Sequence, residues 1–427
     1  MAQYEVEHKA QWLTTRTDSD GAHDAIQAFT TAYGTPPEGV WAAPGRVNLI
    51  GEHVDYAGGL CLPFALTQCA YVAVGRNNDG VYRVVDGKRP ELPVEIAVDT
   101  VGPKSPANWT GYIVGSIWAA AEAGLLSDNT PSHKPSPQGF NIALSSDVPL
   151  GAGLSSSAAI ECSTAIAAVE LSQERNITEE ERVALVNATM RAENEVVGAT
   201  TGGLDQKVSL LGRKDDALAI DFGTGTYRQV PFQIAQAGLA ILVTNTNSPH
   251  SLKDGQYASR RGVIDAVAAH AGKKLLGLVS NPYHEAEEWA AESVPEGVSA
   301  EEWAATVHRR VRHVISEIAR TEKAIQQLEA GDFRAFGESM QRSHISLKHD
   351  YEVSTPELDT VVEIALAHGA LGARMTGGGF GGSAIALIAH DRLAECADAI
   401  AEAFAQRGYP TPEFITAVPS QGARRIR

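Results

Sequence analysis

The segment from Val148 to Ala159 joins a glycine turn to three serines, in the order Val-Pro-Leu-Gly-Ala-Gly-Leu-Ser-Ser-Ser-Ala-Ala. Strong helix formers without proline or glycine follow, up to about position 170, so the serines are predicted at the start of a helix. A helix start offers unpaired N–H groups and the positive end of the helix dipole. Gly151 and Gly153 let the backbone approach an anion closely, and the segment therefore predicts a phosphate site.

An ordinary loop with a capped helix is the alternative interpretation of this serine segment, because serine is a preferred capping residue. The segment is not a Walker loop, since no Gly-Lys-Ser/Thr ends it and the chain contains no Gly-x-x-x-x-Gly-Lys. If a phosphate binds there, the serine hydroxyls could add bonds to its oxygens or reach a magnesium ion.

A second cluster lies at residues 43–56, where an apolar stretch is bracketed by Arg46 and by Glu-His-x-Asp. Glu52, His53 and Asp55 place several hydrogen-bond acceptors within four residues, as recognition of a polyol demands. Metal ligation by His53 with the carboxylates is the rival hypothesis, and a capped turn is the purely structural one.

Five glycines crowd a third cluster at residues 375–383, Met-Thr-Gly-Gly-Gly-Phe-Gly-Gly-Ser. It contains Gly-x-Gly-x-x-Gly, but a strand rather than a helix is predicted after it, which argues against a dinucleotide site. So many glycines predict close approach by a ligand or another loop, with a tight hairpin as the alternative.

A fourth cluster comprises Glu193, at the end of a predicted helix, and Asp205, after a loop of Gly and Thr that includes Gly202. Taken alone, the two carboxylates suit a solvated helix face and a helix N-cap.

Both helices and strands are predicted to position these clusters. Helices are predicted at 21–34, 109–124, 178–195, 255–272, 300–329, 355–368 and 391–407. Strands are predicted at 40–50, 60–75, 81–85, 139–145, 216–222, 238–246 and 384–389. The fold class is therefore α+β. At 427 residues the chain is long for one domain, so we expect two, with a boundary near 210–225.

The composition of the chain disfavours some classes of binding partner and some cellular locations. The net charge of −17 disfavours nucleic acid and anionic membranes as partners, so any nucleotide pocket must make its own positive field. No apolar run is long enough to span a membrane, and the N-terminus lacks a signal-peptide pattern. The four scattered cysteines suit buried positions in a reducing compartment. We expect a cytoplasmic protein and a monomer.

Together the four clusters resemble a known family. Pro-x-x-x-Gly-Leu-Ser-Ser-Ser-Ala-Ala and the late Thr-Gly-Gly-Gly-Phe-Gly-Gly resemble the GHMP small-molecule kinases. The early Gly-Arg-Val-Asn-Leu-Ile-Gly-Glu-His-x-Asp-Tyr is similar to the signature of galactokinases within that superfamily. Trp109-x-x-Tyr112 and the segment from Thr244 to Arg261 also match, and the resemblance covers about residues 25–390. Ala57 departs from the pattern, which usually has Asn there.

The resemblance implies a two-domain kinase with its active site in the cleft between residues 1–212 and 213–427. It implies ATP and Mg²⁺ as cofactors and galactose as the phosphate acceptor. The implied catalytic residues are Asp205 and Arg46, and the implied metal ligands are Ser157 and Glu193. The implied sugar contacts are Glu52, His53, Asp55, Gly202 and Tyr257. The implied ATP contacts are Gly151, Gly153, Leu154, Ser155, Ser156, Ser157, Trp109 and Tyr112.

Two alternatives remain open beside galactose phosphorylation. One is a related kinase that phosphorylates the anomeric position of an N-acetylated or pentose sugar. The other is a non-catalytic sensor of galactose and ATP on the same fold, which is disfavoured because residues 155–159 keep the serine motif uninterrupted.

Overall fold

The computed structural model describes residues 10–126, 138–199, 201–248 and 253–427, without the side chains of residues 253, 254 and 257. The larger helices are α1 (Asp18–Tyr33), α2 (Trp109–Glu122), α3 (Ser156–Gln173), α4 (Glu179–Arg191), α5 (Leu204–Leu211), α6 (Lys253–His270), α7 (Pro282–Glu292), α8 (Ala300–Glu329), α9 (Phe333–Ser346), α10 (Pro356–Ala367) and α11 (Leu393–Arg407). Three sheets accompany them, two mixed and one antiparallel, so the α+β prediction is confirmed.

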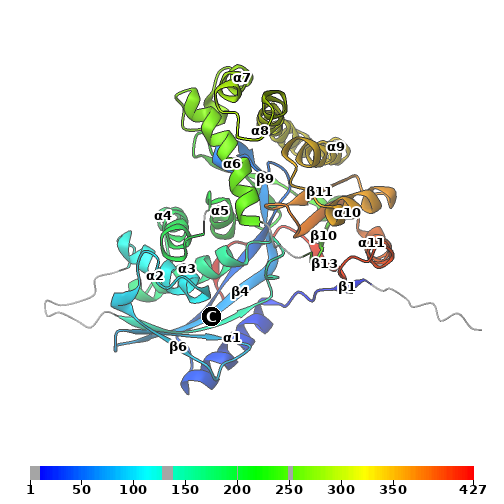
Figure 1. The fold of residues 1–427 in the computed structure, drawn as a ribbon. Helices are drawn as coiled ribbons and strands as arrows, with labels where there is room; N and C mark the ends of the chain where they lie inside the picture. Colours follow the sequence, from blue (N-terminus) through cyan, green and yellow to red (C-terminus); the bar gives the residue numbers. More distant parts are fainter. Residues whose placement is uncertain (1–9, 127–137, 200, 249–252) are drawn as a thin grey trace, which may run out of the picture.

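The largest sheet has the strand order β14-β2-β4-β7-β5-β6. Its strands are β14 (Arg424–Arg425), β2 (Gly39–Asn48), β4 (Pro63–Asn77), β7 (Gly139–Ser146), β5 (Val81–Asp86) and β6 (Val94–Ala97). Alternate residues of β2 enter two different cores: Trp41 and Ala43 join the main core, whereas Val40 and Ala42 join a smaller one with α1. The sheet is therefore covered on both faces, with α1 on one and α3 on the other (Figure 1).

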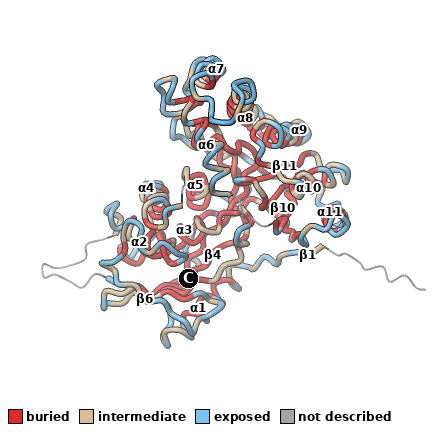
Figure 2. The backbone as a smooth tube through the Cα atoms, in the orientation of Figure 1, coloured by how far each residue is buried: buried red, intermediate tan, exposed pale blue. Residues whose placement is uncertain are grey.

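The second sheet has the order β1-β13-β10-β12-β11 and carries α10 and α11. Its strands are β1 (Gln11–Trp12), β13 (Glu413–Ala417), β10 (Leu239–Asn245), β12 (Ser383–Ala389) and β11 (Gly372–Thr376). A small third sheet joins β3 (Leu60–Cys61), β8 (Asp216–Asp221) and β9 (Tyr227–Pro231), against which α8 packs. Figure 2 shows β4 and β10 as largely buried, while α7 and α11 expose their outer turns.

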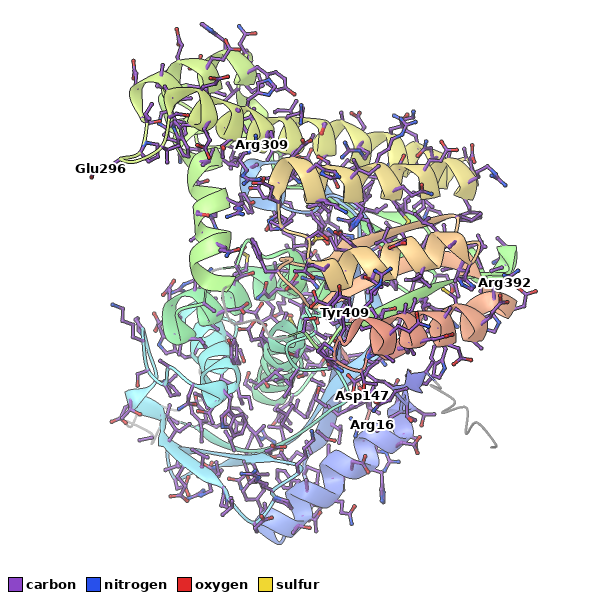
Figure 3. The ribbon with its side chains drawn as sticks, turned by 45° about the vertical axis from the view of Figure 1, so that its right-hand side comes forward. Arg16, Asp147, Glu296, Arg309, Arg392 and Tyr409 are labelled. Carbon is purple, nitrogen blue, oxygen red and sulfur yellow. The ribbon has the colours of Figure 1, made fainter. Side chains whose placement is uncertain are left out.

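At each end of the described chain, the backbone runs from one of the two large sheets to the other. β1 pairs with β13 although it lies near the start of the chain, and β14 near the end pairs with β2. Between β1 and α1, the backbone N–H of Arg16 donates to Asp147 at 3.2 Å, and the two residues lie side by side in Figure 3. A division at residues 212 and 213 stays a prediction, and the terminal strands show that any two units are tied together at both ends.

The four cysteines are all unpaired and buried, as the composition predicts. Among the described residues, no helix is both long enough and apolar enough to cross a membrane.

Candidate active site

The serine segment does begin a helix, because α3 starts at Ser156. Gly151 and Gly153 adopt φ values of 71° and 72°, and Ser155 itself lies in the left-handed region at 60°. The Ser155 side chain makes no capping bond to the helix. Its hydroxyl instead donates to Oδ2 of Asp205 at 2.5 Å. The strained turn therefore points a serine at a carboxylate, which ordinary capping does not require.

Arg46 and Asp205 form an ion pair between a strand and a helix. Nε of Arg46 on β2 lies 2.8 Å from Oδ1 of Asp205, which is in the first turn of α5. Gly203 starts that helix with a φ of 87°, so Asp205 is not the N-cap that its sequence position suggested. The same guanidinium donates to the carbonyl oxygen of Gly153 at 2.5 Å. One arginine thus links the serine loop to Asp205.

Arg46 and Asp205 line a cavity of about 220 Å³. Its walls come from both halves of the sequence, and the lining residues are Arg46, Glu52, His53, Asp55, Thr201, Gly202, Leu204, Asp205, Gly377 and Gly378. Carboxylates, an imidazole and a guanidinium dominate the lining, so the cavity suits a small polar ligand with several hydroxyl groups.

Asp55 lies against Gly202 in the wall of this cavity. A Cβ atom on Gly202 would stand 2.4 Å from Oδ2 of Asp55, so only glycine leaves room for the carboxylate in this position. Burial, together with the charges of Asp205 and Glu52, raises the pKa of Asp55 to about 6. The cavity lining therefore carries more carboxylates, Glu52, Asp55 and Asp205, than cationic groups.

Glu52 holds the glycine-rich loop against β2. Its Oε1 accepts from the Thr376 hydroxyl at 3.0 Å and from the Gly377 N–H at 2.7 Å. Its Oε2 accepts from the Asn48 side chain at 2.8 Å. Both oxygens are therefore engaged by the protein, although the residue also lines the cavity.

His53 lines the cavity, and its own backbone lies in the left-handed region with a φ of 60°. Burial lowers the pKa of its imidazole to about 3, so the ring is neutral at physiological pH. Nδ1 lies 3.3 Å from the Tyr56 hydroxyl, and the ring is tilted by 44° against that of Tyr351, with 4.9 Å between the two centroids. These contacts orient the ring within the cavity wall.

The glycine cluster at 377–382 is the turn between the antiparallel strands β11 and β12. It also approaches the serine loop, since a Cβ on Gly377 would lie 3.2 Å from the carbonyl oxygen of Gly153. The hairpin and the close approach of another loop, both considered from the sequence, are therefore both present.

Glu193 lies in a π-helical turn, Ala192–Val197, that continues α4. The predicted single helix at 178–195 thus changes from α-helical to π-helical hydrogen bonding before it ends, and such π-helical turns are rare and frequently lie at functional sites. Burial and the charge of Asp205 raise the pKa of Glu193 to about 7, while hydrogen bonds from Gln206 and Ser157 oppose the shift.

Ser157 and Glu193 offer a hydroxyl and one carboxylate in direct contact. This donor set fits Mg²⁺, a hard cation that keeps several waters and takes its remaining ligands from phosphates. The described residues contain one group of three side chains that could hold an ion by themselves, His270, Glu285 and Glu288, and it comes from α6 and α7.

Some predicted contacts lie outside this cavity or outside the described part of the chain. Trp109, the first residue of α2, and Tyr112, one turn later, are absent from the lining. Tyr112 is close enough to Glu193 and Glu161 for their charges to raise its pKa, after burial. The side chain of Tyr257 and most of the Pro/Ser loop at 126–138 lie outside the described residues.

Several residues at the site were missed from the sequence. Thr201 and Leu204 line the cavity, and Asn48 and Thr376 hold Glu52. A second buried carboxylate, Glu161, was also missed. Its signal was available, because it is an acid within a helical segment of mostly small and apolar residues.

Comparison with known proteins shows the family of this chain. Models of the GHMP kinase N-terminal and C-terminal domains match residues 112–213 and 324–406. A model of the galactokinase galactose-binding signature matches residues 27–76. A crystal structure of mevalonate kinase shares the fold, with a TM-score of 0.58 at 16% sequence identity over 89% of this chain and 98% of that one. The fold and the serine and glycine loops therefore define a GHMP kinase.

Within that superfamily the similarity is specific. A galactokinase from Streptomyces coelicolor is 42% identical over 94% of this chain and 97% of its own length. The human galactokinase is 38% identical over 86% and 87% of the two chains. The crystal structure of Lactococcus lactis galactokinase complexed with galactose has a TM-score of 0.79 at 32% identity, covering 93% of this chain and 98% of that one. The chain belongs to the galactokinase family.

Proposed function

We propose that this protein transfers the γ-phosphoryl group of ATP to the anomeric hydroxyl of α-D-galactose, which gives galactose 1-phosphate and ADP. The observation that carries the proposal is the position of Asp205 in the cavity wall, held by Arg46 on one oxygen and by Ser155 of the serine loop on the other. A carboxylate is thus fixed between the cavity proposed for the sugar and the serine loop proposed for the phosphates.

In this proposal Asp205 orients the anomeric hydroxyl and accepts its proton as the oxygen–phosphorus bond forms. The leaving group is ADP, so the charge that moves lies mainly on phosphate oxygens. Arg46 places a positive charge beside both Asp205 and the serine loop. Phosphoryl transfer needs positioning and charge neutralisation more than a strong base, and these contacts provide both.

The phosphates are assigned to the turn from Gly151 to Ser157. The left-handed residues of this turn and the start of α3 present backbone N–H groups to an anion. We assign Mg²⁺ to Ser157 and Glu193, where it would neutralise phosphate charge. Trp109 and Tyr112 remain proposed adenine contacts.

The sugar is assigned to the cavity side of Asp205. Asp55 and the neutral His53 supply the groups that read the ring hydroxyls. Gly202 leaves space for the Asp55 carboxylate. Glu52 and Tyr257 remain proposed sugar contacts. For Glu52, the engagement of both oxygens by the protein favours a role in which it shapes the wall.

We propose two domains, residues 1–212 and 213–427, with the active site in the cleft between them. Support comes from the cavity lining, which draws Gly377 and Gly378 from the second half and its other residues from the first. We also propose a monomer, which the net charge of −17 favours by self-repulsion. A cytoplasmic location is supported by the four unpaired, buried cysteines.

The test is a coupled ADP-release assay with ATP, Mg²⁺ and a panel of sugars: galactose, glucose, N-acetylgalactosamine, galactosamine and arabinose. We expect galactose to give by far the largest kcat/KM. A larger value for an N-acetylated or pentose sugar would transfer the proposal to a related kinase. Galactose binding without ADP release would establish a sensor instead.

A further inference from the structure

Glu161 is a fully buried carboxylate that the proposed mechanism does not use. It lies on α3, one helical turn after Ser157, among small and apolar neighbours. Its Oε2 accepts a hydrogen bond from Nε2 of Gln206 at 3.0 Å. Its Oε1 has no hydrogen-bond partner among the described residues. A buried carboxylate with a single partner is costly, which indicates a role beyond packing.

That single partner bridges two acids. Nε2 of Gln206 donates to Glu161 at 3.0 Å and to Oε2 of Glu193 at 2.5 Å. The amide oxygen of Gln206 accepts from the Thr201 hydroxyl at 3.3 Å. Both amide protons and the amide oxygen are therefore used, so the orientation of the amide group is determined by its neighbours.

The bridge joins a residue next to the proposed catalytic carboxylate with a proposed ligand of the cation. Gln206 follows Asp205 directly on α5, and Glu193 lies in the π-helical turn after α4. Without an acceptor at position 161, one amide proton of Gln206 would be left unpaired in a buried place, and the amide group would lose one of the three hydrogen bonds that set its orientation. The hydrogen bond that fixes one oxygen of the Glu193 carboxylate would then be held less firmly.

We propose that Glu161 is a positioning residue that acts through Gln206 to hold the Glu193 carboxylate ready for the divalent cation that accompanies ATP. The inference rests on the proposed function, because it takes Glu193 as a ligand of that cation. Burial and the charge of Glu193 raise the pKa of Glu161 well above its ordinary value. Glutamine keeps an oxygen that can accept from Gln206, so it should serve nearly as well as the acid at this position.

The test compares Glu161→Gln, which keeps an acceptor for Gln206, with Glu161→Met, which keeps the volume and removes the acceptor. Mn²⁺ is titrated into each protein with ADP, and its binding is followed by electron paramagnetic resonance. Outer contacts of metal ligands typically change affinity by about 10- to 100-fold. We expect Glu161→Met to weaken Mn²⁺ binding about tenfold and Glu161→Gln to stay within about threefold of the parent.

Two further measurements separate positioning from general damage. The dissociation constant for galactose, measured by calorimetry without nucleotide, should change less than about twofold in both variants, since neither removes a sugar contact. In the Glu193→Gln background, Glu161→Met should add no further loss of Mn²⁺ binding, because Glu161 affects the cation only through the Glu193 carboxylate.

The inference is overturned if Glu161→Met binds Mn²⁺ like the parent, if Glu161→Gln is as weak as Glu161→Met, or if galactose binding falls in parallel. If Glu161→Met does not fold, Gln206→Met replaces it with the same expectation and the same criteria. Glu193→Gln alone tests the underlying assignment. If that variant binds Mn²⁺ normally, the proposed cation site is wrong, whereas a loss in Glu193→Gln without one in Glu161→Met contradicts only the positioning role.

Discussion

Arg46 contacts Asp205 with one nitrogen and the carbonyl oxygen of Gly153 with another, at 2.8 and 2.5 Å. This residue on β2 therefore fixes the distance between the carboxylate proposed to orient the sugar hydroxyl and the loop proposed to hold the phosphates. In-line transfer depends on that distance, because about 1 Å of misplacement can cost on the order of 100-fold in rate.

Asp205→Asn is expected to lower kcat by about 100- to 10,000-fold, the usual contribution of a positioned proton acceptor. The amide keeps the shape of the side chain but cannot take up the proton. Steady-state kinetics at saturating galactose and ATP would measure the loss, and a thermal unfolding curve would show that the variant is folded. A variant that keeps more than about a tenth of the parent rate would remove Asp205 from the mechanism.

The sequence predicted the parts of this site better than their contacts. The helix that begins at Ser156 and the strand that ends at Asn48 follow from local composition, because helix formers and a glycine turn act within a few residues. The contact between Glu52 and Gly377 spans 325 positions, and nothing local specifies it. The same holds for the Glu161–Gln206–Glu193 bridge, which depends on how α3, α5 and the π-helical turn pack.

The helices α7 and α9 were also missed. The segment Pro282–Glu292 is rich in glutamate, and Phe333–Ser346 contains a glycine and three serines, which are weak helix formers. Each is stabilised by burying one face against α8, so tertiary contacts decide these helices.

Asp55→Ala is expected to raise the galactose KM steeply and to reduce the preference for galactose over glucose. A site built to hydrogen-bond a hydroxyl can reject a sugar that leaves its polar groups unpaired by about 10,000-fold. Removal of the carboxylate removes both the attraction and that penalty, so discrimination should fall with affinity. The measurement is the ratio of kcat/KM for the two sugars. If activity survives and the ratio is unchanged, Asp55 does not read the sugar.

Gly202→Ala is expected to weaken galactose binding at least about tenfold while leaving ATP binding within about twofold, since it perturbs one wall only. The added methyl group would stand 2.4 Å from Oδ2 of Asp55, so the carboxylate must move away from its position in the cavity. Calorimetry with each ligand separately would measure both affinities.

The matched control for that substitution is Gly262→Ala on α6, where a Cβ meets no atom within 4 Å and the residue is helical. Alanine in a helix is favoured over glycine, so this variant should bind both ligands normally and be slightly more stable. Unchanged galactose affinity in Gly202→Ala would show that the Asp55 carboxylate is not held by this contact.

Asp55→Asn is expected to make the protein more stable at neutral pH even as it damages the sugar site. Burial, with Asp205 and Glu52 nearby, raises the pKa of Asp55 from 3.8 to about 6 in the folded protein. A raised pKa means that ionisation of this carboxyl opposes folding. The penalty is absent below the unfolded pKa of 3.8, grows between the two values, and is complete above about 6.

The magnitude follows from the shift of about two pKa units, which corresponds to roughly 3 kcal/mol at most. Asparagine carries no such charge, so the free energy of unfolding of Asp55→Asn should exceed that of the parent by up to about 3 kcal/mol at pH 8 and by almost nothing at pH 3. Urea denaturation at a series of pH values would give both curves. A constant difference between them would mean that Asp55 does not carry a raised pKa in the folded protein. Curves that instead diverge as the pH rises through about 6 would show that the charge proposed to read the sugar is maintained at a cost in stability.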